Sequence, residues 1–176
     1  MVSEDSAVRV LITLIPLAVF CALAVAADLR LGRIPNWLNA AGFVCGLAMS
    51  TATGGTKGLL CAFAGAALGL AILLFPFLLH MVGAGDVKFL AAAGAFTGWR
   101  LLWPSFLLGA LLGGVISLAV LAFSGRSLQA FKQKLVLLLH GVWRAEPLGG
   151  PQAVLLPYAV PLSIGLLLVT GIKAFA

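Results

Sequence analysis

The chain has 176 residues, of which 62% are hydrophobic and only 9% carry a charged side chain. A soluble domain carries about 25% charged residues, so this composition excludes a soluble fold, and the high hydrophobicity excludes intrinsic disorder. The net charge of +6 comes from 11 basic residues spread between apolar runs, which is typical of membrane topology signals and not of nucleic-acid binding. The composition indicates a multi-pass membrane protein.

Uncharged runs predict about six transmembrane helices. Several stretches contain no Asp, Glu, Lys or Arg and approach or exceed the roughly 18–20 residues that cross a hydrocarbon core. Within lipid the backbone must satisfy its own hydrogen bonds, so these runs predict an all-α bundle. We therefore expect one polytopic membrane domain over residues 1–176, with spans at about 8–28, 36–53, 58–80, 86–101, 104–123 and 153–173.

Local features set the expected helix boundaries. Asn36 is a candidate N-cap for the second span, Pro76 is expected to kink the third span near its end, and Pro104 suits the first turn of the fifth. Trp99 and Trp103 mark a membrane interface. The start of the chain is acidic, unlike the basic start of a secretory signal, so we expect the first helix to be retained.

Residues 127–144 predict an amphipathic helix at the cytoplasmic membrane surface. The longest uncharged run in this segment is too short to span a bilayer, and a re-entrant segment is the alternative interpretation. Such a helix would contact anionic lipid headgroups. Its apolar residues recur with helical periodicity at Leu128, Phe131, Leu135, Leu138, Leu139 and Val142.

The basic residues predict the orientation of the chain. With six spans and a periplasmic N-terminus, seven of them fall on one side and four on the other, and the richer side is expected to be cytoplasmic. The richer side has Arg30, Arg33, Lys88, Arg126, Lys132, Lys134 and Arg144, and the other has Arg9, Lys57, Arg100 and Lys173.

Glycines at a spacing of four residues predict close helix packing. Small residues at this spacing let two helix backbones approach each other. We expect the contacts to lie within the bundle, and a homodimer interface is the alternative. The pairs are Gly42/Gly46, Gly65/Gly69, Gly94/Gly98 and Gly109/Gly113.

The distribution of acidic residues is the most informative feature. Asp28 and Asp86 lie at the ends of predicted spans, and two crossings separate them, so both are expected at the cytoplasmic end of the bundle. Ionisable groups at membrane spans suggest function. A carboxyl pair can share a proton, with one member acting as base towards water and the other as acid towards a carbonyl. Alternatively, Asp28 pairs with Arg30 or Arg33, and Asp86 caps the fourth span.

Motifs of other hydrolases are absent from the sequence. There is no HExxH motif for zinc and no GxSxG motif for a serine nucleophile, and His80 and His140 stand alone. Cys21, Cys45 and Cys61 lie in apolar runs without ligand spacing, and we interpret them as core residues. We expect neither a metal nor another cofactor. A small ion- or proton-coupled transporter and a structural subunit of a secretion machine are the competing functions.

Three blocks of sequence follow one another along the chain. The first is DLRLGRIPN, from Asp28 through Arg30 and Pro35 to Asn36, the second is GAGDVKF, which contains Gly83, Gly85, Asp86 and Lys88, and the third is LPYAVPLSIG. Together they resemble the bacterial type IV prepilin peptidases, which are GxGD aspartic proteases, and the third block is similar to the last helix of that family. The resemblance covers residues 20–170 in order.

The resemblance implies an aspartic endopeptidase of the bacterial inner membrane that removes the short, basic leader of prepilins or pseudopilins at the cytoplasmic face. Asp28 and Asp86 match the catalytic aspartates, and Gly83 and Gly85 match glycines that let a substrate backbone approach. The chain lacks the CxxC-bearing region of the bifunctional members, so N-methyltransferase activity is not expected. It resembles the short members that serve Flp-type pili. The oligomeric state stays open.

Overall fold

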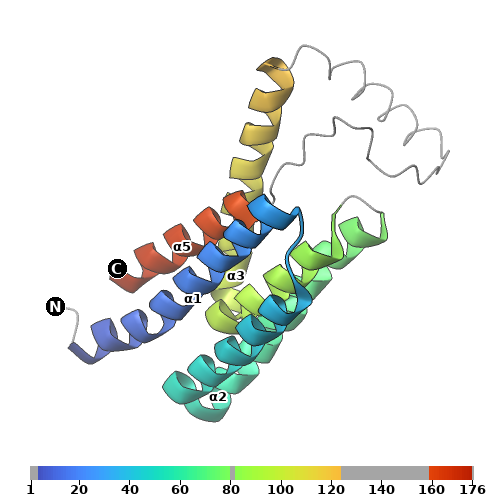
Figure 1. Cartoon of the computed structure of the whole chain (residues 1–176). Coiled ribbons are helices and arrows are strands. Elements are labelled where there is room, and N and C mark those ends of the chain that lie inside the picture. The colour runs from blue at the N-terminus through green and yellow to red at the C-terminus, as the bar shows by residue number, and fades with distance from the viewer. Residues whose placement is uncertain (1–3, 80–81, 124–158, 176) are drawn as a thin grey trace.

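The computed structural model describes residues 4–79, 82–123 and 159–175, and within these ranges the chain is helical without strands. Helices α1 (Glu4–Leu31) and α5 (Ala159–Phe175) are continuous, whereas α2 (Asn36–Leu78) and α3 (Ala84–Phe123) each contain one break (Figure 1). The predicted all-α architecture is confirmed. The interfacial helix expected at 127–144 lies outside the described residues.

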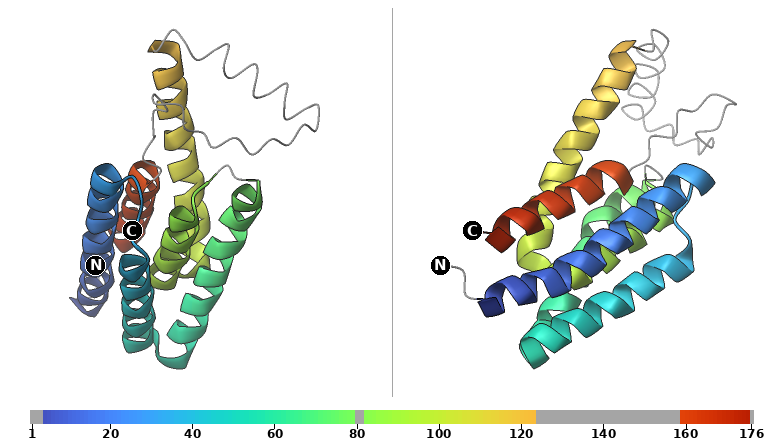
Figure 2. Two further views of the ribbon diagram at one scale, coloured as in Figure 1. Left: turned by 45° about the vertical axis from the view of Figure 1, so that its right-hand side comes forward. Right: turned by 60° about the vertical axis from the view of Figure 1, so that its left-hand side comes forward.

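The breaks in α2 and α3 occur at glycines with left-handed backbone conformations. Gly55 has φ 58° and ψ −141°, and Gly98 has φ 67° and ψ 170°. A straight helix with the length of α2 would measure about 65 Å, roughly twice the hydrocarbon core. Each break instead reverses the direction of its helix: the two halves of α2 run side by side, and the second half of α3 projects beyond the rest of the bundle (Figure 2).

Gly55→Ala should destabilise the protein by about 1–3 kcal/mol, because this combination of φ and ψ is nearly exclusive to glycine. Gly54 is the matched control, since a Cβ at either position would meet nothing within 4 Å and only Gly55 has a positive φ. Gly54→Ala should therefore leave the thermal unfolding midpoint in detergent unchanged or slightly raised. Equal midpoints for the two variants would contradict this account of the break.

The first half of α3, residues 84–97, is the central helix of the bundle. Every side chain from Phe89 to Phe96 is buried. The ring of Phe20 from α1 stacks on Phe89 and Phe96, with centroid distances of 5.3 and 5.8 Å. The run of alanines and glycine after Asp86 thus has a structural reason, because neighbouring helices enclose this segment and only small residues allow their close approach.

The glycines at spacing four pack inside the chain, as predicted. Gly65 and Gly94 lie backbone to backbone, and a Cβ on either would overlap the other's main chain. Gly46 faces the backbone of Ala95 and Phe96. The remaining glycines of the four pairs each contact another helix or the other half of a broken helix: Gly42 meets Phe20, Gly69 meets Leu90, Gly98 meets Cys61, Gly109 meets Leu162, and Gly113 meets Pro161.

Two predicted boundaries are wrong. Pro35, not Asn36, is the N-cap of α2, because its φ of −62° and ψ of 140° are extended while Asn36 is already helical. No side chain caps this helix end. The break between the fourth and fifth predicted spans falls at Gly98, so Pro104 lies inside the helix instead of in its first turn.

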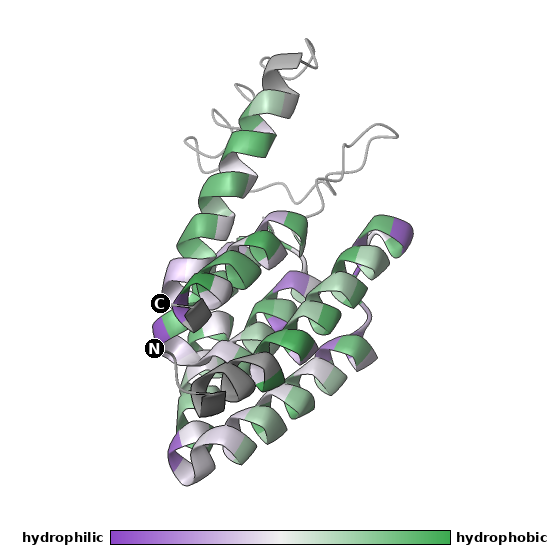
Figure 3. Cartoon of the chain, turned by 90° about the vertical axis from the view of Figure 1, so that its left-hand side faces the viewer, coloured by the Kyte–Doolittle hydropathy of each residue, from purple (hydrophilic) through white to green (hydrophobic). Residues whose placement is uncertain are grey.

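In the part of the chain that the structure describes, three helices are long and apolar enough to cross a membrane: Ile12–Leu31, Asn36–Leu78 and Ala84–Ala119. Hydrophobic residues extend along the helices, and hydrophilic ones gather near their ends (Figure 3). Trp99 and Trp103 are about half exposed, and Arg100 lies 5.3 Å from the centre of the Trp99 ring. This aromatic and basic cluster is typical of a membrane–water interface. The surface is consistent with a membrane protein.

Candidate active site

Asp28 lies in the last turn of α1, on the face that packs into the bundle. Leu17, Cys21 and Ala24 are almost fully buried, and Asp28 follows Ala24 by four residues. Residues at these spacings share one face of a helix, so the carboxyl group continues the buried stripe. The helix ends at Leu31, and just beyond it the N–H of Gly32, with φ 61°, donates to the Asp28 carbonyl at 2.9 Å.

The Asp28 carboxyl group meets the start of α5. The backbone N–H of Ala159 donates a hydrogen bond to it, and such N–H groups at a helix start have no partner within their own helix. The second oxygen, Oδ2, is buried and has no hydrogen-bond partner in the described residues. Arg30 and Arg33 are exposed, and the described chain has no ion pair between either one and Asp28. The ion-pair alternative for Asp28 is therefore wrong.

Asp86 is the third residue of α3 and helps to cap that helix. Gly83 takes the N-cap position, where its carbonyl accepts the N–H of Asp86 at 3.1 Å and that of Val87 at 3.4 Å. In return, the Asp86 carboxylate accepts the backbone N–H of Gly83. This exchange resembles half of a capping box, with the acid at the N3 position. Capping thus explains part of the role of Asp86, although not from the expected N-cap position.

The carboxyl groups of Asp28 and Asp86 lie close enough to interact electrostatically. One is carried by the C-terminal end of α1 and the other by the N-terminal end of α3, so both lie at one end of the bundle, as the counting of crossings predicts. The role of Asp86 in capping α3 does not require its carboxyl group to lie near that of Asp28. Neighbouring carboxyl groups can share one proton and together act as general base and general acid.

The segment between α1 and α2 packs against the turn before Asp86. Ile34 is 5% exposed, and its backbone and Cβ lie 3.5–3.6 Å from where a Cβ on Gly85 would be. Asn39, one turn into α2, donates from Nδ2 to the carbonyl oxygen of Gly85 at 3.1 Å. Sequence reasoning missed Asn39. The available signal was an amide side chain inside a predicted span, three residues after Asn36.

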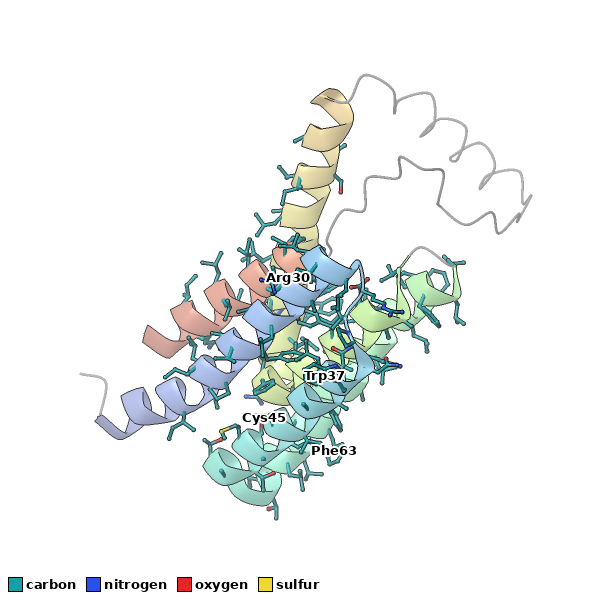
Figure 4. All side chains as sticks on the ribbon, in the orientation of Figure 1. Arg30, Trp37, Cys45 and Phe63 are labelled. Carbon is teal, nitrogen blue, oxygen red and sulfur yellow. The ribbon has the colours of Figure 1, made fainter. Side chains whose placement is uncertain are left out.

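Lys88 and Asn36 form a second contact between the same segments. The Lys88 Nζ donates to Asn36 Oδ1 at 2.9 Å, and both side chains are exposed. Trp37, in the first turn of α2, is 70% exposed, and Arg30 lies on the last turn of α1 (Figure 4). The structure thus brings Lys88 and Asn36 together and leaves Arg30 at the rim of the site.

The motif glycines have room around them. A Cβ on Gly83 would come no closer than 3.5 Å to Asp86 Oδ2, and a Cβ on Gly85 would make contacts of 3.5 Å or more. Both distances are ordinary van der Waals contacts, and neither glycine has a positive φ. Packing among the described residues therefore does not explain why these positions lack side chains.

The cysteines differ from one another in their surroundings. Cys21 is buried, whereas Cys45 is half-buried and Cys61 is exposed. The interpretation as core residues is confirmed for Cys21 and is wrong for Cys61. Within the described ranges no three His, Cys, Asp or Glu residues gather as metal ligands. His80 and His140 lie outside those ranges.

Comparison with known proteins gives one match. The sequence model of the type IV leader peptidase family matches residues 15–118, which is more than half of the chain and includes both aspartates. No curated protein and no solved structure matches the chain.

Proposed function

The chain belongs to the type IV leader peptidase family, and from this premise we propose that it is an aspartic endopeptidase that removes the short, basic leader of prepilins or pseudopilins. The observation that carries the proposal is the interaction between the carboxyl groups of Asp28 and Asp86 at one end of the bundle. Both residues lie within the part of the chain that matches the family.

The proposed reaction uses the two carboxyl groups as a base and an acid. One carboxylate takes a proton from a water molecule, whose oxygen attacks the carbonyl carbon of the scissile peptide bond, and the other carboxylic acid protonates the carbonyl oxygen. The tetrahedral intermediate then breaks at the C–N bond, and the leaving amine takes up a proton. The Asp28 Oδ2, which is buried and has no hydrogen-bond partner in the described residues, supports this proposal, because this oxygen is available to hold a proton or to accept one from water.

The proposed membrane arrangement has six crossings and places the carboxyl pair at the cytoplasmic face of the inner membrane. The breaks at Gly55 and Gly98 support six crossings, since they divide α2 and α3 into antiparallel halves. The exposed Arg30, Arg33 and Lys88 near the carboxyl pair support a cytoplasmic location under the positive-inside rule.

The exposed position of Gly83 supports the binding of an extended substrate there. A glycine leaves its local backbone uncovered by a side chain, and a substrate backbone can lie against it. The proposed scissile bond lies between the basic leader and the hydrophobic segment of the pilin, so the leader stays in the cytoplasm while the hydrophobic segment occupies the membrane.

The transporter alternative has less support. Transport sites in membrane proteins lie near the bilayer midplane, often at interrupted helices. Asp28 and Asp86 lie at helix ends instead, and the breaks in α2 and α3 occur at the glycines of the opposite turns. The family match also indicates a peptidase.

Co-expression with a prepilin from the same genome tests the proposal. We expect the pilin to lose its leader only when this chain is present, which gives a faster-migrating band and a new N-terminus just before the hydrophobic segment. N-terminal sequencing of the product locates the cut. A prepilin that keeps its leader, although both proteins accumulate in the membrane, would contradict the proposal once each genomic prepilin has been tried.

A further inference from the structure

We propose that Asn39 is a positioning residue of this site: its side-chain amide holds the Gly83–Asp86 turn and thereby fixes the Asp86 carboxyl group opposite Asp28. The inference rests on the proposed peptidase function and adds to it a residue outside the matched motifs. Asn39 is 3% exposed and donates from Nδ2 to the carbonyl oxygen of Gly85 at 3.1 Å.

Chemistry fixes the orientation of the Asn39 amide. A backbone carbonyl only accepts hydrogen bonds, so the side-chain atom that faces Gly85 must be the NH2 group. The other end, Oδ1, is buried and has no hydrogen-bond partner in the described residues. A buried amide that satisfies so little of its hydrogen-bonding capacity contributes less to the stability of the fold than an apolar residue of the same volume. The presence of asparagine at position 39 is therefore better explained by the hydrogen bond from its NH2 group to the Gly85 carbonyl.

The turn that Asn39 holds is one that needs an external fixing point. Gly83 and Gly85 flank Ala84 immediately before Asp86, and glycine has more backbone freedom than any other residue. The Gly85 peptide leads directly into Asp86, so a rotation of that peptide would move the carboxyl group. The amide of Asn39 and the contact with Ile34 restrict that rotation.

Asn39 acts from beneath the site, so its effect should be on turnover and not on substrate binding. Its side chain is buried and donates to the Gly85 backbone, so a substrate does not contact it. A misplacement of about 1 Å at a reacting group can cost roughly a hundredfold in rate. We therefore expect loss of the Asn39 donor to lower kcat by about this factor, while KM changes by less than about threefold.

Ser50 offers a matched control on the same helix pair. Its Oγ donates to the Ala95 carbonyl at 2.8 Å, so it also joins α2 to a backbone carbonyl of α3, but nine residues beyond Asp86. Ser50→Ala removes an equivalent interhelical hydrogen bond far from the carboxyl pair. If Asn39 served only to join the helices, loss of either hydrogen bond would have a similar effect on leader cleavage.

The test compares Asn39→Leu, Asn39→Asp and Ser50→Ala in a leader-cleavage assay across pH, with rates divided by the wild-type rate at each pH. This normalisation removes the pH dependence that the variants have in common with the wild-type enzyme. We expect Asn39→Leu to be slow at every pH. Asn39→Asp should be slow at neutral pH and recover at least about tenfold in acid, because a protonated carboxyl group can again donate to Gly85. Ser50→Ala should stay within about twofold of wild type.

Each outcome tests either the positioning role of Asn39 or the proposed peptidase function. A wild-type kcat in Asn39→Leu, or no acid recovery in Asn39→Asp, overturns the role of Asn39. If Asn39→Leu does not accumulate as folded protein, the acid recovery of Asn39→Asp, which keeps the shape of asparagine, decides alone. Asp86→Asn in the same assay separates the hypotheses: if it still cleaves, the proposed function fails, whereas an inactive Asp86→Asn beside a fully active Asn39→Leu overturns only the inference.

Discussion

Asp28→Asn and Asp86→Asn should each lower the rate of leader removal by about a thousandfold or more, since each removes one of two general acid–base groups. Both variants should still fold. The amide oxygen of Asp86→Asn can accept the Gly83 N–H in place of the carboxylate, so the helix cap persists. In Asp28→Asn, one oxygen can still accept the Ala159 N–H, and the NH2 group replaces the unpartnered Oδ2.

The double variant is the sharper form of this prediction. Residues that act as one unit show strongly non-additive effects, so Asp28→Asn with Asp86→Asn should be little slower than either single variant. Two independent groups would instead multiply their losses. Initial rates of leader cleavage with purified enzyme, at equal amounts of folded protein, give the comparison.

Asp5→Asn is the matched control, because Asp5 lies at the opposite end of α1, about 35 Å along the helix from Asp28. It removes the same functional group and should keep the wild-type rate. A fully active Asp28→Asn or Asp86→Asn would show that the two carboxyl groups do not form a catalytic pair.

The position of the two aspartates could be predicted from sequence because it depends only on counting helices. Two apolar runs separate Asp28 from Asp86, and an even number of crossings returns a chain to the same side. The packing of the glycine pairs was predictable for a similar reason, since a spacing of four places both glycines on one helix face. The number of apolar runs and the spacing of glycines can both be read directly from the sequence.

Contacts between backbone and side chain were not predictable in the same way. The Ala159 N–H that binds Asp28 belongs to every non-proline residue, so nothing in the sequence marks it. Asn36 and Asn39 are chemically identical, and only the extended conformation of Pro35 decides that Asn36 is not the cap. Trp99 and Trp103 mark a membrane interface in the sequence, but they do not indicate which residue breaks the helix, so the positive φ of Gly98 was not predictable.

Gly94→Leu should destabilise the protein by at least about 3 kcal/mol, at the upper end of the cost of overpacking, because the obstacle is backbone and not a side chain that can turn away. A Cβ on Gly94 would lie 2.5 Å from the carbonyl carbon of Gly65 and 3.0 Å from the nitrogen of Ala66. Membrane helices associate largely through such close packing, so a leucine here forces α2 and the central half of α3 apart.

Gly114→Leu is the control in the same helix, since a Cβ there meets nothing within 4 Å and the residue is exposed. Leucine favours helix more than glycine does, so this variant should match or slightly exceed the wild-type unfolding midpoint in detergent. A wild-type midpoint for Gly94→Leu would contradict the backbone contact.

The central half of α3 also carries Asp86 at its start, so a small shift of this helix changes the separation of the two carboxyl groups. A displacement of about 1 Å affects catalysis more than it affects folding. The smaller Gly94→Ala, where it still folds, should therefore lose leader-cleavage activity before it loses stability.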